Sequence, residues 1–588
     1  MKQTQTITLS DTAVRPNSTA VMLTAIICFY VLFSFFNLSP LEEDAYIYFR
    51  FAENIASGHG YVFNPGGEKI EGCSSITWLF LLVFIKLLGL NILLVVKALG
   101  IMCGCCSLVV IYNITARLTS PGLLATMPSL LTALSVPFLM RNQMGMEEPL
   151  YTLVFLSLIL ICVNEKYFKY WPFALFLVII SRPEGMLIAL GMVPVFYHYR
   201  KQRRDIVAGI VILLVLICSL FLVRLFYFHD LLPSPFYHKV YPGKYRDSIK
   251  YLHGFLKDYY MYFFLTPLVC LLFRKEARDM QKAILLGFAS VHCLWVLLAG
   301  ACYFPFYRHV VPVIPVFYIL VFAILVELFP LKPALRNSIL IGFFGLYGCT
   351  ALLLPGVNWN IWKQEPNFIA GNIKIFLSGP APYLNSLINK IREPRFSLKY
   401  AIDSQTLVGL FIKNNYLKGT TFLYDQMGRL PYSAGTDYSF IDDNGLIDKD
   451  VAHTIFSLDS RSSRLLSLYD RLSKVIIKTI FPEAQFYSSE TEIINNIFEK
   501  KPDVIMCFVF MRNMVINGLG KDPRLKKEYV PTYYIDGVLF LERRGLQKKE
   551  FNNNTGRLPV FFKNEIYAQV KEHPWLSPPN PSGGYKNP

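Results

Sequence analysis

The chain is 588 residues long, and 53% of its residues are hydrophobic, 15% aromatic and only 17% charged. A soluble surface needs about a quarter charged residues, so this composition excludes a soluble globular enzyme, a disordered protein and a disulfide-rich scaffold. The net charge of +17 would suggest nucleic acid as the partner of a soluble chain, but the apolar residues fall in long blocks, so the charge must first be assigned to a side of a membrane.

Membrane-crossing helices are expected wherever roughly 17 to 25 consecutive residues are mainly apolar. The first such run, residues 20–38, is too long for the apolar region of a signal peptide and leads into two glutamates and an aspartate instead of a cleavage site, so we expect it to remain as an anchor. The sequence predicts ten further spans, at about 92–114, 122–140, 149–163, 170–181, 185–198, 207–227, 259–273, 283–300, 308–329 and 337–356.

The run 76–90 is short and contains Lys86, and we expect it to form a helix at the membrane interface. With eleven spans and a cytoplasmic N-terminus, the cytoplasmic segments sum to +10, as the positive-inside rule requires. If 76–90 crossed the bilayer, every later loop would change sides, and the basic residues at 200–204 would face outward. The predicted fold is therefore a polytopic α-helical membrane protein with about 11 transmembrane helices in residues 1–356.

Residues 357–573 have a mixed polar sequence and a modest positive charge, and the odd number of spans places them outside the cytoplasm. Short β-rich runs at 420–424, 504–510 and 537–542 alternate with helical patterns at 397–413 and 490–501, which predicts a C-terminal extracytoplasmic α/β domain. The tail 574–588 is rich in Pro, Ser and Gly and is expected to be disordered.

Most of the twelve cysteines lie inside the apolar runs, where a cysteine is usually a small buried hydrophobic residue. Cys103, Cys105 and Cys106 form a cluster that could be taken for a redox motif, but we favour packing as their role. No Cys/His spacing typical of a structural zinc site is present.

Polar outliers gather at the predicted outer ends of the spans. Charged groups near membrane depth usually line a cavity or pair with one another, so acids and cations on one face indicate a site for an anionic, lipid-borne ligand. They lie in the first loop, residues 39–91 (Glu42, Glu43, Asp44, Arg50, His59, Glu68 and Glu71), and in four later segments, at 144–148, 181–185, 232–239 and 304–308.

The first loop contains a helical pattern in which Ile47, Phe51 and Ile55 share one face and Arg50 lies on the other. This pattern predicts an amphipathic helix on the membrane surface, with Glu53 and Asn54 also on its polar side, ended by glycines at 58 and 60. The acids just before it would then lie at the boundary between water and lipid, facing a cavity. Alternatively, they only favour the N-terminus of the helix through its dipole, and both interpretations stay open.

The loop resembles the first extracytoplasmic loop of the GT-C glycosyltransferases, which are polytopic enzymes that use polyprenyl-phosphate sugars. The resemblance is closest to the branch of the mycobacterial terminal arabinofuranosyltransferases and covers nearly the whole chain in order. It rests on the segments 43–52, 56–66, 71–78, 145–147, 182–185, 232–239, 305–308 with Pro312 and Pro315, 425–428, 442–448 and 501–503. Two departures stand out: Glu43 replaces the first of two usual aspartates, and Cys302 stands where relatives tend to have an acid.

The resemblance implies roles for ten residues, with the sugar transferred by inversion. Asp44 would be the base that takes the proton of the acceptor hydroxyl, Glu43 the catalytic carboxylate next to it, and Glu147 a second active-site carboxylate. The donor phosphate and sugar would be bound by Arg182, Lys239 and Arg308, by Tyr237 and His238, and by Arg50 and His59. For the three phosphate cations the alternative is an interfacial anchor or a buried pair, such as Arg182 with Glu184, and His59 more commonly caps a turn.

The sequence thus predicts a glycosyltransferase of the bacterial plasma membrane that moves a sugar from a polyprenyl-phosphate donor to an envelope glycan or lipid. Nucleic acid is not an expected partner, because the positive charge lies in the cytoplasmic loops and the outer domain. The resemblance also raises a divalent metal ion as a cofactor, because some members of the family hold one near the first-loop acids. The alternatives are a transporter or lipid-linked-sugar flippase, which would place charges near the mid-bilayer, and a non-catalytic scaffold.

Overall fold

The structure is a computed structural model of the chain. It describes residues 16–36, 39–199, 203–239, 245–259, 261–264, 280–300, 302, 306–328, 333–353, 404–461, 463–484, 486–487, 489–508, 514–535 and 538–549. The chain divides into two compact units. The helical unit contains Met1–Ser39, Lys97–Leu213 and Tyr245–Gly379, and the α/β unit contains Pro40–Val96, Leu214–Lys244 and Pro380–Pro588.

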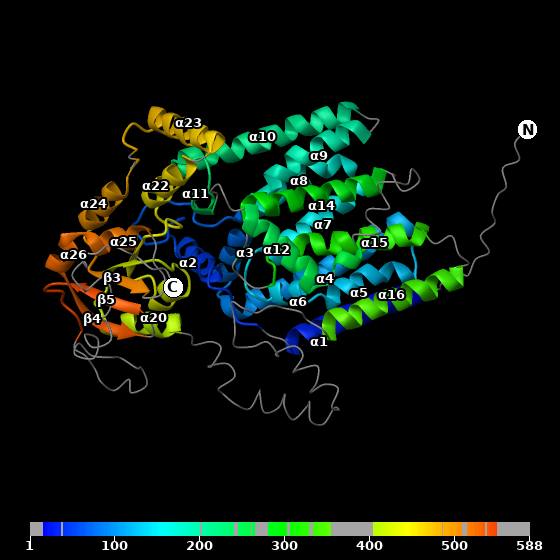
Figure 1. Cartoon of the computed structure of the whole chain (residues 1–588), viewed down its shortest axis with the longest axis horizontal. Coiled ribbons are helices and arrows are strands. Elements are labelled where there is room, and N and C mark those ends of the chain that lie inside the picture. The colour runs from blue at the N-terminus through cyan, green and yellow to red at the C-terminus, as the bar shows by residue number, and fades with distance from the viewer. Residues whose placement is uncertain are drawn as a thin grey trace, which may run out of the picture. The chain divides into compact units, whose positions relative to one another are not determined.

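Helices, most of them apolar, make up the helical unit (Figure 1). They are α1 (Pro16–Phe36), α4 (Ile92–Thr119), η1 (Leu123–Thr126), α5 (Met127–Leu134), α6 (Val136–Arg141), α7 (Glu148–Val163), η2 (Phe168–Tyr170), α8 (Trp171–Ser181), α9 (Gly185–Tyr199), α10 (Arg203–Phe228), α12 (Tyr245–Asp258), η3 (Met261–Phe264), α14 (Met280–Ala299), η4 (Val311–Val313), α15 (Ile314–Leu328) and α16 (Pro333–Leu353). Helices α4 and α10 continue into the α/β unit.

Four helices of the described chain are long and apolar enough to cross a membrane: Ser18–Phe35, Ile92–Thr119, Arg204–Phe228 and Met280–Ala299. The chain is therefore a membrane protein, as its composition predicts. Shorter apolar helices occupy most of the other predicted spans. The predicted span 122–140 is interrupted at Ser135, just before Val136 and Pro137 begin α6, because proline cannot continue a helical hydrogen-bond ladder.

Close packing joins the helices of this unit. An added Cβ at Gly191 of α9 would lie 2.4 Å from a methyl of Val291 in α14, so only glycine fits there. Phe155 of α7 meets Phe288 of α14 edge-on, with ring centroids 5.7 Å apart. These contacts join α7 and α9 to α14, and charged residues described below lie at the start of α7 and just before α9.

The α/β unit combines the first loop, the end of α10 and the C-terminal region. Its further elements are α2 (Ala45–Ala56), α3 (Ile76–Leu87), α11 (Ser234–Lys239), α20 (Ser404–Asn415), β1 (Thr421–Tyr424), α21 (Arg429–Ala434), β2 (Ser439–Asp442), α22 (Lys449–Ser460), α23 (Arg464–Ile480), α24 (Glu490–Lys500), β3 (Val504–Phe508), α25 (Met514–Lys521), α26 (Pro523–Glu528), β4 (Tyr529–Ile535) and β5 (Val538–Arg543). The helix at 76–90 exists as α3; its place at the membrane interface stays a prediction.

The five-stranded sheet has the order β2-β1-β3-β5-β4. Strands β2 and β3 both pair in parallel with β1, and β5 pairs antiparallel with β3 and β4. One face packs Leu423 and Ile505 against Ile494 of α24 and Val515 of α25. On the other face the ring of Phe540 lies 5.8 Å from that of Phe411 in α20. Neighbouring residues of a strand thus enter opposite cores.

Strands form at each of the three predicted β-rich runs, and helices at the two predicted helical patterns. The sequence did not predict β2 or β4. Strand β2 is short and ends at Asp442, and strand β4 contains Pro531. The first loop and residues 214–244 belong to the same compact unit as the C-terminal region, whereas the sequence predicted one division at residue 356. That boundary and the tail 574–588 lie outside the described residues.

Candidate active site

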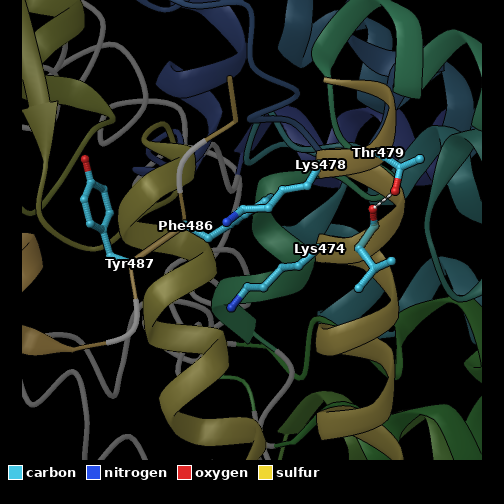
Figure 2. A pocket seen from close by; sticks show the side chains of 6 residues that line it. Lys474, Lys478, Thr479, Phe486 and Tyr487 are labelled. Carbon is cyan, nitrogen blue, oxygen red and sulfur yellow. Dashed lines mark hydrogen bonds between the residues drawn. The ribbon is translucent and has the colours of Figure 1, made fainter. Parts of the chain in front are cut away.

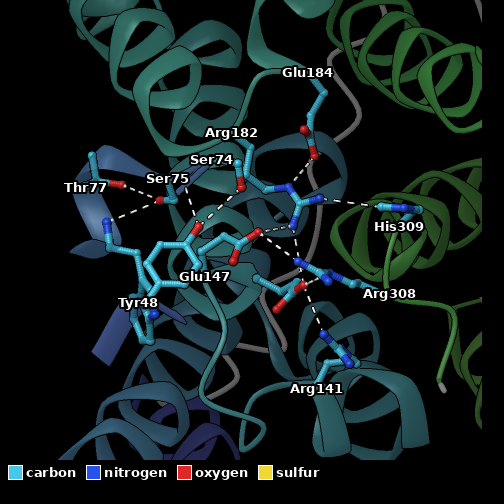
Figure 3. Close-up of polar contacts among 12 residues, drawn as sticks. Tyr48, Ser74, Ser75, Thr77, Arg141, Glu147, Arg182, Glu184, Arg308 and His309 are labelled. Atoms are coloured by element: carbon cyan, nitrogen blue, oxygen red, sulfur yellow. Dashed lines mark hydrogen bonds and ion pairs between the residues drawn. The ribbon is translucent and has the colours of Figure 1, made fainter. Parts of the chain in front are cut away.

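Six charged side chains form a buried cluster in the helical unit (Figure 3). They come from four places in the sequence: the end of α6, the start of α7, the break between α8 and α9, and the segment before η4. All are at least 94% buried. The members of this arginine–glutamate cluster are Arg141, Glu147, Glu148, Arg182, Glu184 and Arg308.

Local backbone structure explains how the acids reach the cluster. Gly145 adopts a φ of 84°, which a glycine tolerates and which turns the chain into α7. Glu147 is the N-cap of α7 and Glu148 its first residue, with Pro149 directly after. The exposed N–H groups of a helix N-terminus favour negative charge, so this start stabilises both glutamates.

The backbone conformation of Arg182 is determined by Pro183, which follows it. The residue before a proline is pushed out of the helical region, and Arg182 has an extended backbone with φ −159° and ψ 146°. Helix α8 therefore ends at Ser181, and α9 restarts at Gly185, where an added Cβ would meet the Ile179 backbone at 2.5 Å. The Arg-Pro-Glu-Gly sequence thus places both Arg182 and Glu184 at a sharp break between helices.

Arg308 follows two residues with unusual backbone angles. Phe306 and Tyr307 have φ values of 63° and 50°, a left-handed conformation that is strained for bulky side chains. The hydroxyl of Tyr307 donates to the carboxylate of Asp258, which helps to hold the turn. Strained residues of this kind are common at functional sites, and this turn leads directly into Arg308, which joins the cluster.

The cluster is linked by short ion pairs. Arg182 donates from Nη1 to Glu147 Oε1 at 2.6 Å and reaches Glu148 Oε1 at 3.4 Å, and its Nε pairs with Glu184. Arg308 Nη2 lies 3.3 Å from Glu147 Oε1, and its Nε pairs with Glu148. Arg141 Nη2 lies 3.0 Å from Glu148 Oε1. Three arginines and three glutamates therefore balance formally.

The three glutamates share a second feature. Each uses Oε1 for its ion pairs, while the buried Oε2 of Glu147, Glu148 and Glu184 has no hydrogen-bond partner among the described residues. A buried acceptor without a donor costs about 1–3 kcal/mol. Hydroxyl groups of a bound sugar are donors of the kind that these oxygens lack, so the cluster offers both cations for an anion and acceptors for hydroxyls.

The structure brings together Glu147, Arg182 and Arg308 from the predicted site, and it also contains the alternative pair of Arg182 with Glu184. The sequence-based site residues did not include Arg141 or Glu148. A signal for them existed: an arginine seven residues before a glutamate, both in apolar surroundings, requires a partner because a buried charge is costly alone. His309 also joins, with Nδ1 3.5 Å from Arg182 Nη2.

In the α/β unit the carboxylate of Glu43 docks onto the C-terminal region. Its Oε1 accepts the backbone N–H groups of Gly428 at 2.7 Å and Arg429 at 3.3 Å, at the start of α21. Arg429 in turn donates from Nη2 to the carbonyl of Leu41 at 2.6 Å. The side chain of Glu43 thus fixes the first loop to the turn that follows β1, which favours a positioning role for it.

Asp44 differs from Glu43 in its position and its contacts. It is the N-cap residue of α2, its side chain makes no cap hydrogen bond, and it is only half-buried. Helix α2 is itself held in place by Tyr48, whose hydroxyl accepts the Ser75 N–H at 3.0 Å (Figure 3). The role of Asp44 as the base stays a prediction from the sequence.

The pKa of Glu43 supplies a prediction. Burial and the neighbouring Asp44 raise it from the ordinary 4.5 to about 8, against the opposing effect of the Gly428 and Arg429 N–H groups. A carboxyl group whose pKa is raised in the folded state contributes most to stability when it is protonated, below pH 4.5. This contribution is lost as the pH rises through about 8, because the folded state then carries a buried charge. We expect the unfolding midpoint of the wild type to fall relative to that of Glu43→Gln between pH 5 and 8, measured by thermal unfolding in detergent. Equal pH profiles would contradict this expectation.

Helix α2 forms over the predicted residues. Arg50 and Asn54 were expected on its polar side, but both side chains are fully buried. All five N–H groups of Arg50 are used, because the guanidinium donates to Asn64 at 3.5 Å and to four backbone carbonyls. Those carbonyls belong to Phe63 at 3.0 Å, Pro431 at 2.6 Å, Gly435 at 2.9 Å and Tyr438 at 2.8 Å. These contacts favour a structural role for Arg50 over the predicted donor binding.

Tyr237 belongs to a different network of the α/β unit. Its hydroxyl donates to Asp230 Oδ1 at 2.6 Å, and His453 Nε2 lies 2.8 Å from Asp230 Oδ2. The rings of Tyr237 and His453 are 4.1 Å apart, which ties α11 to α22. His238 and Lys239 lie in α11, but their side chains are outside the described residues, and His59 is exposed after α2.

Three further acids follow the parallel strands β1 and β2: Asp425, Asp442 and Asp443. Burial raises the pKa of Asp425 to about 6 and that of Asp442 to about 7, although Asp442 accepts the N–H groups of Asn444 and Ile447. Within the described ranges no group of three or more His, Cys, Asp or Glu side chains could hold a metal ion. The two N–H groups that Asp442 accepts organise the loop after β2.

Comparisons with known proteins concern the fold alone. No protein-family model and no curated protein matches the sequence. The crystal structure of ArnT from Cupriavidus metallidurans bound to undecaprenyl phosphate matches with a TM-score of 0.50 at 12% identity, over 89% of this chain and 98% of that chain. The oligosaccharyltransferase AglB from Archaeoglobus fulgidus, in complex with an inhibitory peptide and a dolichol-phosphate, matches with a TM-score of 0.49 at 11% identity, over 90% of this chain and 74% of that chain. The likeness to ArnT shows that the two chains share a fold.

Proposed function

We propose that this protein is a membrane glycosyltransferase that transfers a sugar from a polyprenyl-phosphate donor. The observation that carries the proposal is the buried arginine–glutamate cluster, because cations held near membrane depth by acids are typical of a site for an anionic ligand. The shared fold supports it, since the matching ArnT structure binds undecaprenyl phosphate. The acceptor is proposed to be an envelope glycan or lipid on the extracytoplasmic face of a bacterial plasma membrane.

The proposed chemistry is a single displacement with inversion at the anomeric carbon. The acceptor hydroxyl oxygen forms the new bond to that carbon while its proton passes to the carboxylate of Asp44. The bond between the anomeric carbon and the phosphate oxygen breaks, and the polyprenyl phosphate leaves with the electron pair. Arg182 and Arg308 are proposed to neutralise this phosphate, since guanidinium groups match phosphate oxygens in geometry and charge.

Within this proposal the glutamates have two tasks. Glu147, Glu148 and Glu184 hold the arginines in place when no donor is bound, because a buried cation without a partner is costly. Their unpartnered Oε2 atoms then accept hydroxyl groups of the donor sugar. The finer resemblance to the mycobacterial terminal arabinofuranosyltransferases makes a pentofuranose donor the first to test.

A transfer assay tests the function directly. The purified protein in proteoliposomes is given radiolabelled polyprenyl-phosphate sugars, starting with polyprenyl-phosphate arabinofuranose, together with an envelope glycan acceptor. We expect the label to move to the glycan with release of one polyprenyl phosphate for each sugar transferred. Movement of an intact labelled lipid across the bilayer, without transfer to any acceptor, would instead identify a flippase and overturn the proposal.

A further inference from the structure

Helix α23 (Arg464–Ile480) of the α/β unit presents three different faces. One face points into the protein: Asp470, Ser473 and Ile477 are buried. Asp470 accepts a hydrogen bond from Ser457 of α22 at 3.1 Å, and the Tyr469 ring lies 5.9 Å from that of Phe236 in α11. The helix is therefore firmly attached along one side only, and its other side remains open among the described residues.

The open side carries a continuous apolar stripe. Its residues recur at the spacing of one helix face, and each is between 41% and 62% exposed. Isolated exposed apolar residues are common on protein surfaces, but a contiguous row of them marks an interaction site. The members of this apolar stripe are Leu468, Leu472, Val475, Ile476 and Ile480.

A row of cations borders the stripe. Arg464, Arg471 and Lys478 are spaced by seven residues, so they lie above one another along the helix, and all three are exposed. Lys474 and Lys478 extend toward the Phe486 ring, with Nζ atoms 5.6 Å and 5.9 Å from its centre (Figure 2). With Thr479 and Tyr487 they line a shallow pocket of about 450 Å³. An apolar stripe flanked by cations complements a surface that has acyl chains below and anionic groups above.

A second observation places the end of this helix. Helix α10 is long and apolar enough to cross a membrane, and its apolar stretch ends at Phe228. The next residue, His229, stacks on Phe481, which directly follows α23, with ring centroids 4.0 Å apart. Both residues belong to the α/β unit. The C-terminal end of α23 therefore lies where a membrane span ends, which is the depth of the lipid headgroups.

From these observations we propose that α23 is an interfacial anchor that lies on an anionic phospholipid surface. Its apolar stripe enters the acyl boundary, and Arg464, Arg471 and Lys478 bind lipid phosphates, as expected of amphipathic helices at membranes. This anchor attaches the α/β unit to the bilayer at a second place besides the span itself. The inference does not depend on which reaction the protein performs.

Photo-crosslinking in the full-length protein tests the anchor. p-Benzoyl-phenylalanine replaces Leu472 in one variant and the exposed Glu499 of α24 in a matched control, both in nanodiscs of phosphatidylglycerol and phosphatidylcholine. After illumination, mass spectrometry should find phospholipid adducts at position 472 and not at 499. Adducts at 472 that join only to another part of the chain or to a second copy, or an absence of lipid adducts there, would overturn the proposal.

The cation row is tested in the same assay. The triple variant Arg464→Gln, Arg471→Gln and Lys478→Gln should form several-fold fewer lipid adducts at 472 in nanodiscs that contain phosphatidylglycerol. In nanodiscs of phosphatidylcholine alone its yield should equal that of the unsubstituted protein. A yield that is independent of the cations in both membranes would refute the electrostatic part of the proposal, and a yield that falls equally in both would indicate a damaged helix instead of lost headgroup binding.

Discussion

Replacement of Asp44 by asparagine is expected to lower kcat for sugar transfer by about 100- to 10,000-fold, the usual contribution of a general base. The amide keeps the size of the side chain but cannot accept the proton of the acceptor hydroxyl. Glu43→Gln should lose much less, because an amide oxygen can still accept the Gly428 and Arg429 N–H groups. The pair of variants thus decides which of the two neighbouring acids is the base.

The measurement is initial transfer rate at saturating donor, with thermal unfolding and polyprenyl-phosphate binding as parallel readouts. Glu53→Gln is the matched control, since Glu53 lies in the same helix and pairs at the surface with Lys86 at 3.4 Å. It should retain the wild-type rate. Asp44→Asn protein that folds and binds lipid normally but turns over at the wild-type rate would refute the assignment of Asp44 as the base.

Replacement of Arg182 by glutamine is expected to destabilise the protein by about 3–5 kcal/mol, because it leaves the buried carboxylate of Glu184 without its cation and Glu147 with Arg308 alone. Glu147 and Glu184 both pair with this guanidinium. The double variant Arg182→Gln with Glu184→Gln removes one charge of each sign, so it should be more stable than the single variant. Polyprenyl-phosphate binding should nevertheless be weakened in both, since Arg182 is proposed to contact the phosphate.

Thermal unfolding in detergent gives the stability, and a lipid-binding titration gives the affinity. Lys166→Gln removes a positive charge at an exposed position and should change stability by no more than about 0.5 kcal/mol. If the double variant were as unstable as the single one, the Arg182–Glu184 pair would not be the source of the loss. Wild-type lipid affinity in a folded single variant would remove Arg182 from the phosphate site.

Local sequence signals were sufficient to predict several parts of the structure. The apolar runs predicted membrane helices because the bilayer leaves a crossing segment no other way to satisfy its backbone groups. The spacing of Ile47, Phe51 and Ile55 predicted α2, and the sequence Arg-Pro-Glu-Gly at 182–185 lies at the break between α8 and α9. Each of these features depends on residues within a few positions of one another.

The candidate site was predictable only in part. Glu147, Arg182 and Arg308 were expected on one side of the molecule, yet nothing in the sequence revealed that Arg308 would share the carboxylates of Glu147 and Glu148 with Arg182 across 126 positions. Arg50 illustrates the reverse case. It was predicted to bind the donor, but three of the four carbonyls that it binds belong to residues 381 to 388 positions away.

The sequence by itself determined that this is a membrane protein with apolar spans and with acids and cations at their ends, because hydropathy and charge act through local composition. Only the tertiary structure decided which cation pairs with which acid. It also decided that Glu43 binds the backbone at the start of α21 and that Arg50 donates its hydrogen bonds to backbone carbonyls. The physical reason is range: hydropathy is summed along the chain, whereas a hydrogen bond or a buried ion pair forms only between atoms that the fold brings within about 3–4 Å.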